Sequence, residues 1–188
     1  MFANTGREMP QTLDFVNECS VRWNVPVVWL EYDRVDNRAT YRIASWDDHA
    51  MFGEPFELLL RRKKYLPNTV MRFCTSELKI LTMKRYLTKQ FGWKQWTLHE
   101  AGVTKRNIYE FWKSQPFDLQ LENVNGATPL GNCDMCFLKS EKILANIAKT
   151  MPDKADWWIR MEQETGSTFR KDRNLAEFTD FVGRQSDW

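Results

Sequence analysis

The sequence has no apolar run near the roughly 20 residues that a membrane-spanning helix needs. It also lacks the basic and then apolar start of a secretory signal peptide. Histidine is scarce: the two residues of this type are isolated and give no metal-binding spacing. The net charge of +2 is too small to indicate nucleic-acid binding by itself. These absences predict a cytoplasmic protein without a membrane partner, and they give no support to a nucleic-acid partner.

The composition is that of a folded protein, because 43% of the 188 residues are hydrophobic and 28% are charged. A chain of this length is expected to form one domain with a substantial core. We expect a sheet-containing core over residues 1–100 and a helical, cysteine-containing part over residues 101–188. Four cysteines without an export signal indicate a reducing compartment, where thiols serve as metal ligands or catalysts.

The first part of the chain predicts a strand–helix–strand unit. Residues 1–3 are apolar, residues 4–6 (Asn-Thr-Gly) suit a tight turn, and an amphipathic helix is expected over residues 10–23. The β-branched and aromatic run 26–32 is typical of a strand. The crossover implies parallel pairing of the two strands. In an α/β sheet such a turn lies at the carboxyl edge, where backbone N–H groups favour anions.

A second informative stretch begins at Arg72. Thr75 or Ser76 is expected to cap a helix that runs to about Lys89, which places Cys74 just before the helix N-terminus. That position favours a thiolate and bound anions. The alternative for the basic residues of this stretch is a solvated helix surface.

Among the later helices, one is expected to run from a Thr104 cap to Lys113. Its apolar residues Ile108, Phe111 and Trp112 are expected to face inward.

The cysteines provide one further motif. Cys133 and Cys136 lie in a loop rich in Gly, Pro and Asn, with two residues between them. This spacing suits two thiolate ligands of one metal ion or cluster. Cys74 is the obvious third ligand, whereas Cys19 is interpreted as a small core residue. A redox pair and unligated thiols remain open as alternatives.

Several motifs resemble the phosphoadenosine phosphosulfate (PAPS) reductase family of the adenine nucleotide alpha-hydrolase, or PP-loop, superfamily. Asn4-Thr5-Gly6 followed by Pro10 and Thr12 is similar to the Asp-Thr-Gly…Phe-Pro-Glu-Thr segment of that family. Further similar stretches occur in the same order and cover nearly the whole chain; they are residues 26–32, 72–84, 101–121 and 126–139. Together they look most like the phage and prophage branch.

The resemblance implies a fold, a ligand and a chemistry. The fold would be a three-layer, Rossmann-like parallel sheet, incomplete here, with a helical C-terminal part. The protein would bind an adenine nucleotide, PAPS or ATP, and catalyse sulfonucleotide reduction or adenylation with sulfur transfer, served by a thiol reductant protein. A [4Fe–4S] cluster or zinc would be the cofactor. The implied nucleotide-binding residues are Asn4, Thr5, Gly6, Arg72 and Lys79, and the implied metal ligands are Cys74, Cys133 and Cys136.

The sequence departs from the family in four places. The Ser-Gly-Gly-x-Asp-Ser loop that cradles phosphate, with its strand, is absent before Met1, and so is a later Gly-x-Arg-x-x-Glu-like loop. Phe73 replaces one cysteine of the family's early Cys-Cys pair. The catalytic cysteine of the family's C-terminal tail has no counterpart after Arg170.

Two explanations of these departures remain open: a fragment of a longer gene product, or a degenerate relative. The second predicts a catalytically inactive binding module for a protein or nucleic-acid partner. Its candidate contacts are Trp93, Trp96 and Trp188. A small zinc-binding protein unrelated to nucleotides is a third alternative, which rests on the cysteines alone.

Overall fold

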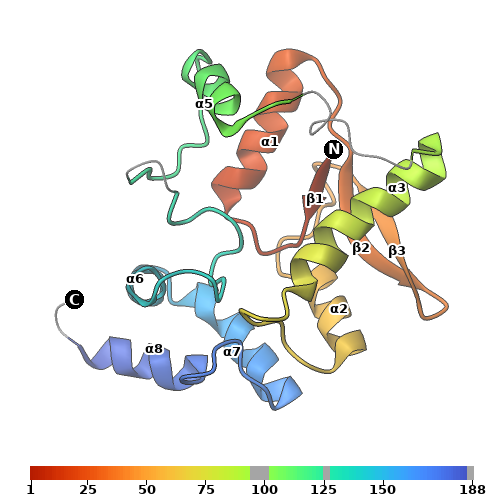
Figure 1. Cartoon of the computed structure of the whole chain (residues 1–188). Helices are drawn as coiled ribbons and strands as arrows, with labels where there is room; N and C mark the ends of the chain where they lie inside the picture. The colour runs from red at the N-terminus through yellow and green to blue at the C-terminus, as the bar shows by residue number, and fades with distance from the viewer. Residues whose placement is uncertain (94–101, 125–127, 186–188) are drawn as a thin grey trace.

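The computed structural model describes residues 1–93, 102–124 and 128–185 (Figure 1). It is a mixed α/β protein. Helices pack against a small sheet in the N-terminal part, and the C-terminal part is a group of helices. In chain order its elements are β1 (Phe2–Asn4), α1 (Pro10–Trp23), β2 (Trp29–Val35), β3 (Arg38–Ala44), α2 (Glu54–Lys63), η1 (Thr75–Leu81), α3 (Thr82–Phe91), α5 (Lys105–Lys113), α6 (Glu141–Thr150), α7 (Asp153–Thr165) and α8 (Leu175–Arg184).

The sheet has the strand order β1-β2-β3. β1 pairs in parallel with β2, in the register Phe2↔Trp29, and α1 forms the crossover, which confirms the predicted strand–helix–strand unit. β3 pairs antiparallel with β2 through a hairpin whose two turn residues, Asp36 and Asn37, both have positive φ. The described sheet is therefore mixed, whereas a parallel one was expected.

Local sequence signals were sufficient to predict both ends of α1. Pro10 stands in the first turn of the helix, and Asn24 ends it in the left-handed conformation with φ of 50°. The helix ends at Trp23, as the sequence predicted.

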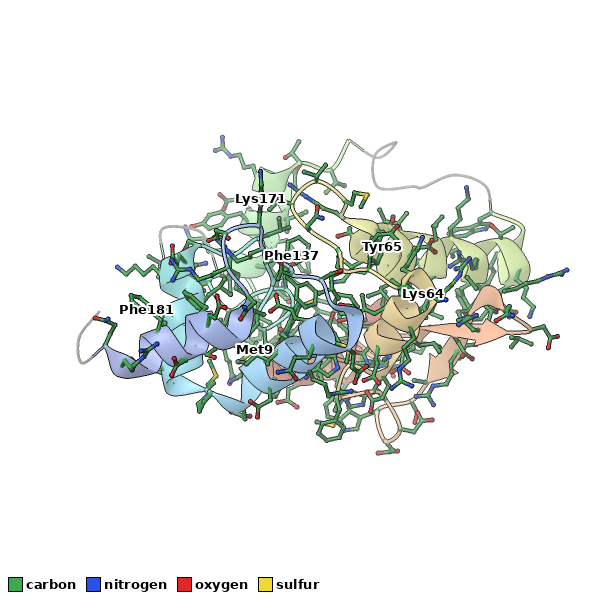
Figure 2. All side chains as sticks on the ribbon, turned by 90° about the horizontal axis from the view of Figure 1, so that it is seen from below. Met9, Lys64, Tyr65, Phe137, Lys171 and Phe181 are labelled. Carbon is green, nitrogen blue, oxygen red and sulfur yellow. The ribbon has the colours of Figure 1, made fainter. Side chains whose placement is uncertain are left out.

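The main hydrophobic core joins the sheet to the C-terminal helices. α2 packs on β2, and η1 contacts both β1 and β2. The largest cluster of buried side chains includes Tyr32, Leu59, Leu78, Trp158 and Phe178, which come from the strands and from helices early and late in the chain. Figure 2 shows Phe137 within this crowded interior, where its side chain is 3% exposed. The N-terminal and C-terminal parts therefore share one core.

The stretch after Arg72 is helical, but its form differs from the prediction. Phe73 and Cys74 already lie in the helix, so Cys74 does not precede it. Neither Thr75 nor Ser76 acts as the predicted cap, since η1 has no side-chain cap bond. η1 is a π-helix, a rare form that is frequently found at functional sites, and α3 continues it.

α5 begins as predicted but buries less than expected. Thr104 and Asn107 form a reciprocal capping box at its start. Ile108 and Phe111 are 49% and 47% exposed, which contradicts the predicted inward face. Trp112 packs against α1 as foreseen, with its ring centroid 4.9 Å from that of Phe15, and the ring of Phe111 also contacts α1, with its centroid 5.7 Å from that of Trp23. No helix in the described part of the chain is long and apolar enough to cross a membrane.

Candidate functional site

The turn between β1 and α1 is held by the side chain of Asn4. Its amide nitrogen donates to Glu31 Oε1 and to the backbone oxygen of Ala50, both at 2.8 Å. Its side-chain oxygen accepts from the Gly6 N–H at 3.0 Å. Asn4 is completely buried, and these bonds use both ends of its amide. The structure therefore gives Asn4 a positioning role that ties the turn to β2.

Gly6 allows a close approach of two backbone segments. Its φ is +75°, and a Cβ atom at this position would lie 2.7 Å from the backbone nitrogen of Gly53. Real Cβ atoms do not come that close to backbone atoms, so another side chain here requires a shift of the chain. Gly6 thus seats the turn against the start of α2.

The N–H groups of the turn already have an anionic partner within the protein. Glu8 Oε2 accepts from the Thr5 N–H at 3.0 Å, from the Thr5 hydroxyl at 2.8 Å and from the Arg7 N–H at 3.3 Å. The side chain of Glu8 is 2% exposed. The anion-binding capacity predicted for this turn is therefore occupied by a carboxylate of the same chain. The sequence reasoning missed Glu8, although its position three residues after a threonine is a known capping pattern.

The turn is joined to the cysteine loop by a buried ion pair. The Arg7 guanidinium binds the Asp134 carboxylate, with 8% and 2% of the two side chains exposed. The Asp134 N–H also donates to the Arg7 carbonyl at 2.9 Å. The other Asp134 oxygen accepts from Trp158 Nε1 at 2.8 Å. These contacts place Cys133 directly beside the turn, where it forms a single β-bridge with Glu8.

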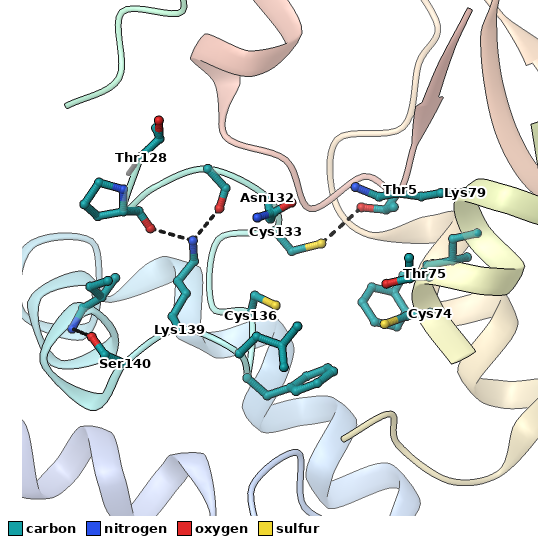
Figure 3. Close-up of a pocket in the computed structure, with 17 residues that line it drawn as sticks. Thr5, Cys74, Thr75, Lys79, Thr128, Asn132, Cys133, Cys136, Lys139 and Ser140 are labelled. Atoms are coloured by element: carbon teal, nitrogen blue, oxygen red, sulfur yellow. Dashed lines mark hydrogen bonds between the residues drawn. The ribbon is translucent and has the colours of Figure 1, made fainter. Parts of the chain in front are cut away.

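A cavity of about 350 Å³ lies between the turn, the start of η1 and the cysteine loop (Figure 3). It brings together residues that the sequence analysis singled out separately. Of the predicted nucleotide-binding residues, Thr5 and Lys79 line it; Asn4, Gly6 and Arg72 do not. All three predicted metal ligands line it: Cys74, Cys133 and Cys136. The structure thus assembles five of the eight predicted site residues around one space.

Arg72 lies apart from this cavity. Its side chain is exposed, and its Nε donates to the backbone oxygen of Thr69 at 3.4 Å. This environment matches the alternative of a solvated surface charge.

Two lysines supply positive charge at the cavity from opposite sides (Figure 3). Lys79 Nζ lies 3.5 Å from Glu8 Oε1. Burial is the largest single influence and acts to lower the pKa of Lys79, but the charge and hydrogen bond of Glu8, together with the nearby Cys133 and Cys74, raise the pKa overall. Lys139 donates to the carbonyls of Pro129 and Gly131 at 2.7 and 2.5 Å, and burial lowers its pKa. Sequence reasoning had missed Lys139, because a lone lysine in a loop carries no signal.

The thiols do not form a metal-binding group as the structure places them. Cys133 Sγ lies 3.7 Å from the Thr5 hydroxyl oxygen, and the Cys74 thiol lies on the other side of the cavity, at the residue directly before η1 (Figure 3). Burial raises the pKa of Cys74 and of Cys133, which favours the protonated thiol in the absence of a metal ion. Among the described residues, no three His, Cys, Asp or Glu side chains are arranged to hold a metal ion. The predicted cluster or zinc site does not fit this arrangement.

Cys19 is separate from these thiols. It lies in α1 with 8% of its surface exposed, as its interpretation as a core residue predicted.

Comparison with known proteins identifies a phage relative. The chain is 28% identical, over 169 residues, to an uncharacterised nin region protein, ORF290, of Escherichia phage lambda. The match covers 74% of this chain and 56% of that protein, so the chain spans about half the length of its relative. No protein-family model matches the sequence, and no solved structure matches it. The source of the relative is consistent with the expectation of a phage protein, and the relative's name assigns neither an activity nor a family.

Proposed function

We propose that the cavity binds an adenine sulfonucleotide and that the chain is a PAPS reductase-like protein with a Rossmann-like core. One observation carries the proposal: Thr5, Lys79 and the three cysteines line one cavity, although Thr5 and Cys133 are 128 residues apart in the chain. The resemblance implied nucleotide binding for two of these residues, and it implied that the three cysteines form a metal or cluster site that assists sulfur transfer. Their convergence is what a site for a sulfur-containing nucleotide requires.

The charge of the cavity suits an anionic ligand. Lys79 and Lys139 line it together with the hydroxyls of Thr5 and Ser140. Glu8 offsets one of the two lysine charges, since it pairs with Lys79. A volume of about 350 Å³ is at the lower end of the range of roughly 300–1,000 Å³ for small-molecule sites. The anionic end of the ligand would therefore lie between the two lysines.

The proposed chemistry takes place next to the thiols. In a reduction, the sulfonyl group would face Cys133 and Cys136, and a thiol reductant protein would restore the reduced state. In adenylation with sulfur transfer, ATP would be the nucleotide. These two reactions are distinguished by which nucleotide binds.

The test is calorimetric titration of the purified, anaerobically handled chain with PAPS and with ATP. We expect micromolar binding of one nucleotide. Lys79→Ala is expected to weaken it about tenfold or more, since a hydrogen bond to a charged group contributes about 1.5–3 kcal/mol. Arg72→Ala is the matched control: it also removes one positive charge, but outside the cavity, and should bind like the unmodified chain.

Lys79→Ala leaves the buried Glu8 without its partner, so its folding must be checked by circular dichroism, with Lys79→Arg as a second variant that keeps the charge. Equal losses in the Arg72 and Lys79 variants, or no binding of either nucleotide by the unmodified chain, would refute the proposal.

The second candidate function is the inactive binding module. It is favoured by the observation that Glu8 already occupies the N–H groups of the turn. Among its predicted aromatic contacts, Trp93 is 49% exposed, whereas Trp96 and Trp188 lie outside the described residues. An affinity pull-down with the chain and with Trp93→Ala tests this reading. Loss of one defined partner in the variant would support it, and nucleotide turnover without a partner would exclude it.

A further inference from the structure

Cys133 and Cys136 stand at the two ends of one tight turn. The Cys136 N–H donates to the Cys133 carbonyl at 3.3 Å, which closes a turn over Asp134 and Met135. The Cα atoms at the ends of such a turn lie less than about 7 Å apart. The Cα atoms of disulfide-bonded cysteines are about 4.4–6.8 Å apart. The backbone thus already holds this pair near the separation that a disulfide needs.

Both thiols line the cavity, and a reagent in the cavity has access to them. Cys133 and Cys136 are each half-buried free cysteines. In Figure 3 their sulfur atoms both point into the space between the cysteine loop and η1. Cys74 lines the same cavity from the residue before η1, in a different segment of the chain, and Cys19 is buried in α1. Of the four cysteines, Cys133 and Cys136 are therefore the two that are arranged to form a disulfide bond.

The backbone on both sides of the pair is fixed by other contacts. Asp134, between the two cysteines, is anchored by Arg7 and by Trp158. After the pair, Lys139 donates to the carbonyls of Pro129 and Gly131 and closes the loop on itself. A change at the sulfur atoms consequently leaves the shape of the loop intact, which suits a group that cycles between two states.

We propose that Cys133 and Cys136 are a redox-active dithiol, which forms a reversible intrachain disulfide by exchange with a small organic disulfide that enters the cavity. This inference accounts for the poor fit of the cysteines to a metal site. It does not depend on the proposed nucleotide ligand, and it places a two-electron donor on the wall of that ligand's cavity.

The exchange balances as two successive displacements. One thiol of the pair loses its proton, attacks a sulfur of the small disulfide and releases one small thiol, which takes up a proton. A mixed disulfide with the protein remains. The second cysteine then attacks the protein sulfur of that bond, and the second small thiol leaves with the second proton. The pair has lost two electrons and two protons, and the small disulfide has been reduced to two thiols.

The short ring makes the disulfide easy to reduce. A bond across four residues removes little chain entropy from the unfolded state, so it adds little stability. Exposed disulfides are among the labile, catalytic or regulatory ones, and a bond between Cys133 and Cys136 would lie on the cavity wall within reach of a reductant.

The test is thiol mapping of the full chain. The protein, kept with a metal chelator and without nucleotide, is equilibrated with mixtures of reduced and oxidised glutathione, quenched with an alkylating agent and digested for mass spectrometry. We expect two of the four cysteines to lose alkylation as the oxidised fraction rises, in one peptide that carries a Cys133–Cys136 bond. Excess dithiothreitol should restore full alkylation.

Two variants sharpen the result. Cys133→Ser is expected to stop at a glutathione adduct on Cys136, whereas Cys74→Ser should form the disulfide like the unmodified chain. Alkylation of all four cysteines at every ratio, or a disulfide that includes Cys74, would overturn the inference. Both of these refuting results are measured on the unmodified chain, so the test remains decisive even if a variant fails to fold. Because no nucleotide is present, this result is independent of the calorimetric one.

Discussion

Replacing Asp134 by alanine should destabilise the whole fold, because this carboxylate is the buried point where the N-terminal turn meets the cysteine loop. Asp134 binds the Arg7 guanidinium, and its second oxygen accepts from Trp158 Nε1 and from the Met135 N–H. The Arg7 guanidinium also lies over the ring of Trp157, 5.1 Å from its centroid. Removal of Asp134 thus leaves a buried cation without its counter-ion.

The free energy of unfolding of Asp134→Ala is expected to be several kcal/mol lower than that of the unmodified chain. Breaking a buried ion pair by removing one partner costs about 3–5 kcal/mol, because the remaining charge stays out of water. The Trp158 N–H, left without its acceptor, adds to this cost. The free energy of unfolding of a domain is about 5–15 kcal/mol, so the loss is a large fraction of the total. With a urea dependence of about 2 kcal/mol per molar, the unfolding midpoint should fall by about 1.5–2.5 M.

The assay is urea unfolding followed by tryptophan fluorescence and circular dichroism. Asp134→Asn keeps one acceptor oxygen for Trp158 but loses the charge, so its midpoint should lie between those of Asp134→Ala and the unmodified chain. Asp180→Ala is the matched control, since it breaks the pair with Arg184, whose side chains are 66% and 71% exposed. Exposed pairs contribute little, and the control should unfold like the unmodified chain. A midpoint for Asp134→Ala equal to that of the control would refute the reasoning.

The remaining predictions concern a glycine and a buried acid. Gly6→Ala should lower the free energy of unfolding by about 1–3 kcal/mol, because the added Cβ meets the backbone of Gly53. Gly183→Ala should not lower the free energy of unfolding, because the space around its added Cβ is open. Equal melting temperatures for the two variants would contradict this. Burial raises the pKa of Glu162, so its contribution to stability is present at low pH and is lost as the pH rises through the folded-state pKa. Glu162→Gln should therefore flatten the fall in urea midpoint from pH 4 to pH 7; an unchanged slope would exclude this role.

Much of the architecture could be predicted because its signals act over a few residues. Pro10 and Asn24 bound α1 by their backbone preferences, and Thr104 caps α5 through its own side chain. The β-branched and aromatic run 26–32 predicted a strand that overlaps β2, although β2 begins and ends three residues later. Such signals determined the limits of α1, the start of α5 and the parallel pairing of β1 with β2.

The prediction of the site was only partly successful. Spacing and resemblance selected Thr5, Lys79 and the cysteines, and the structure places them around one cavity. Asn4 and Gly6 were assigned to the ligand, but their contacts hold the turn to the rest of the protein. A short motif indicates that a turn is needed, yet it does not say which polar atoms of that turn stay free.

The remaining features depend on residues that are distant in sequence and are brought together only by packing. Arg7 and Asp134 are 127 positions apart, and no local pattern in either segment announces the pair. No local pattern indicates that Lys139 lines the cavity. The exposure of Ile108 likewise could not be predicted locally, because it depends on what α5 packs against. Backbone propensity acts along the chain, whereas burial, charge pairing and the direction of a thiol are set by neighbours across the core. The sequence alone therefore determined the elements and the candidate residues, and the tertiary structure decided which of those residues share a cavity.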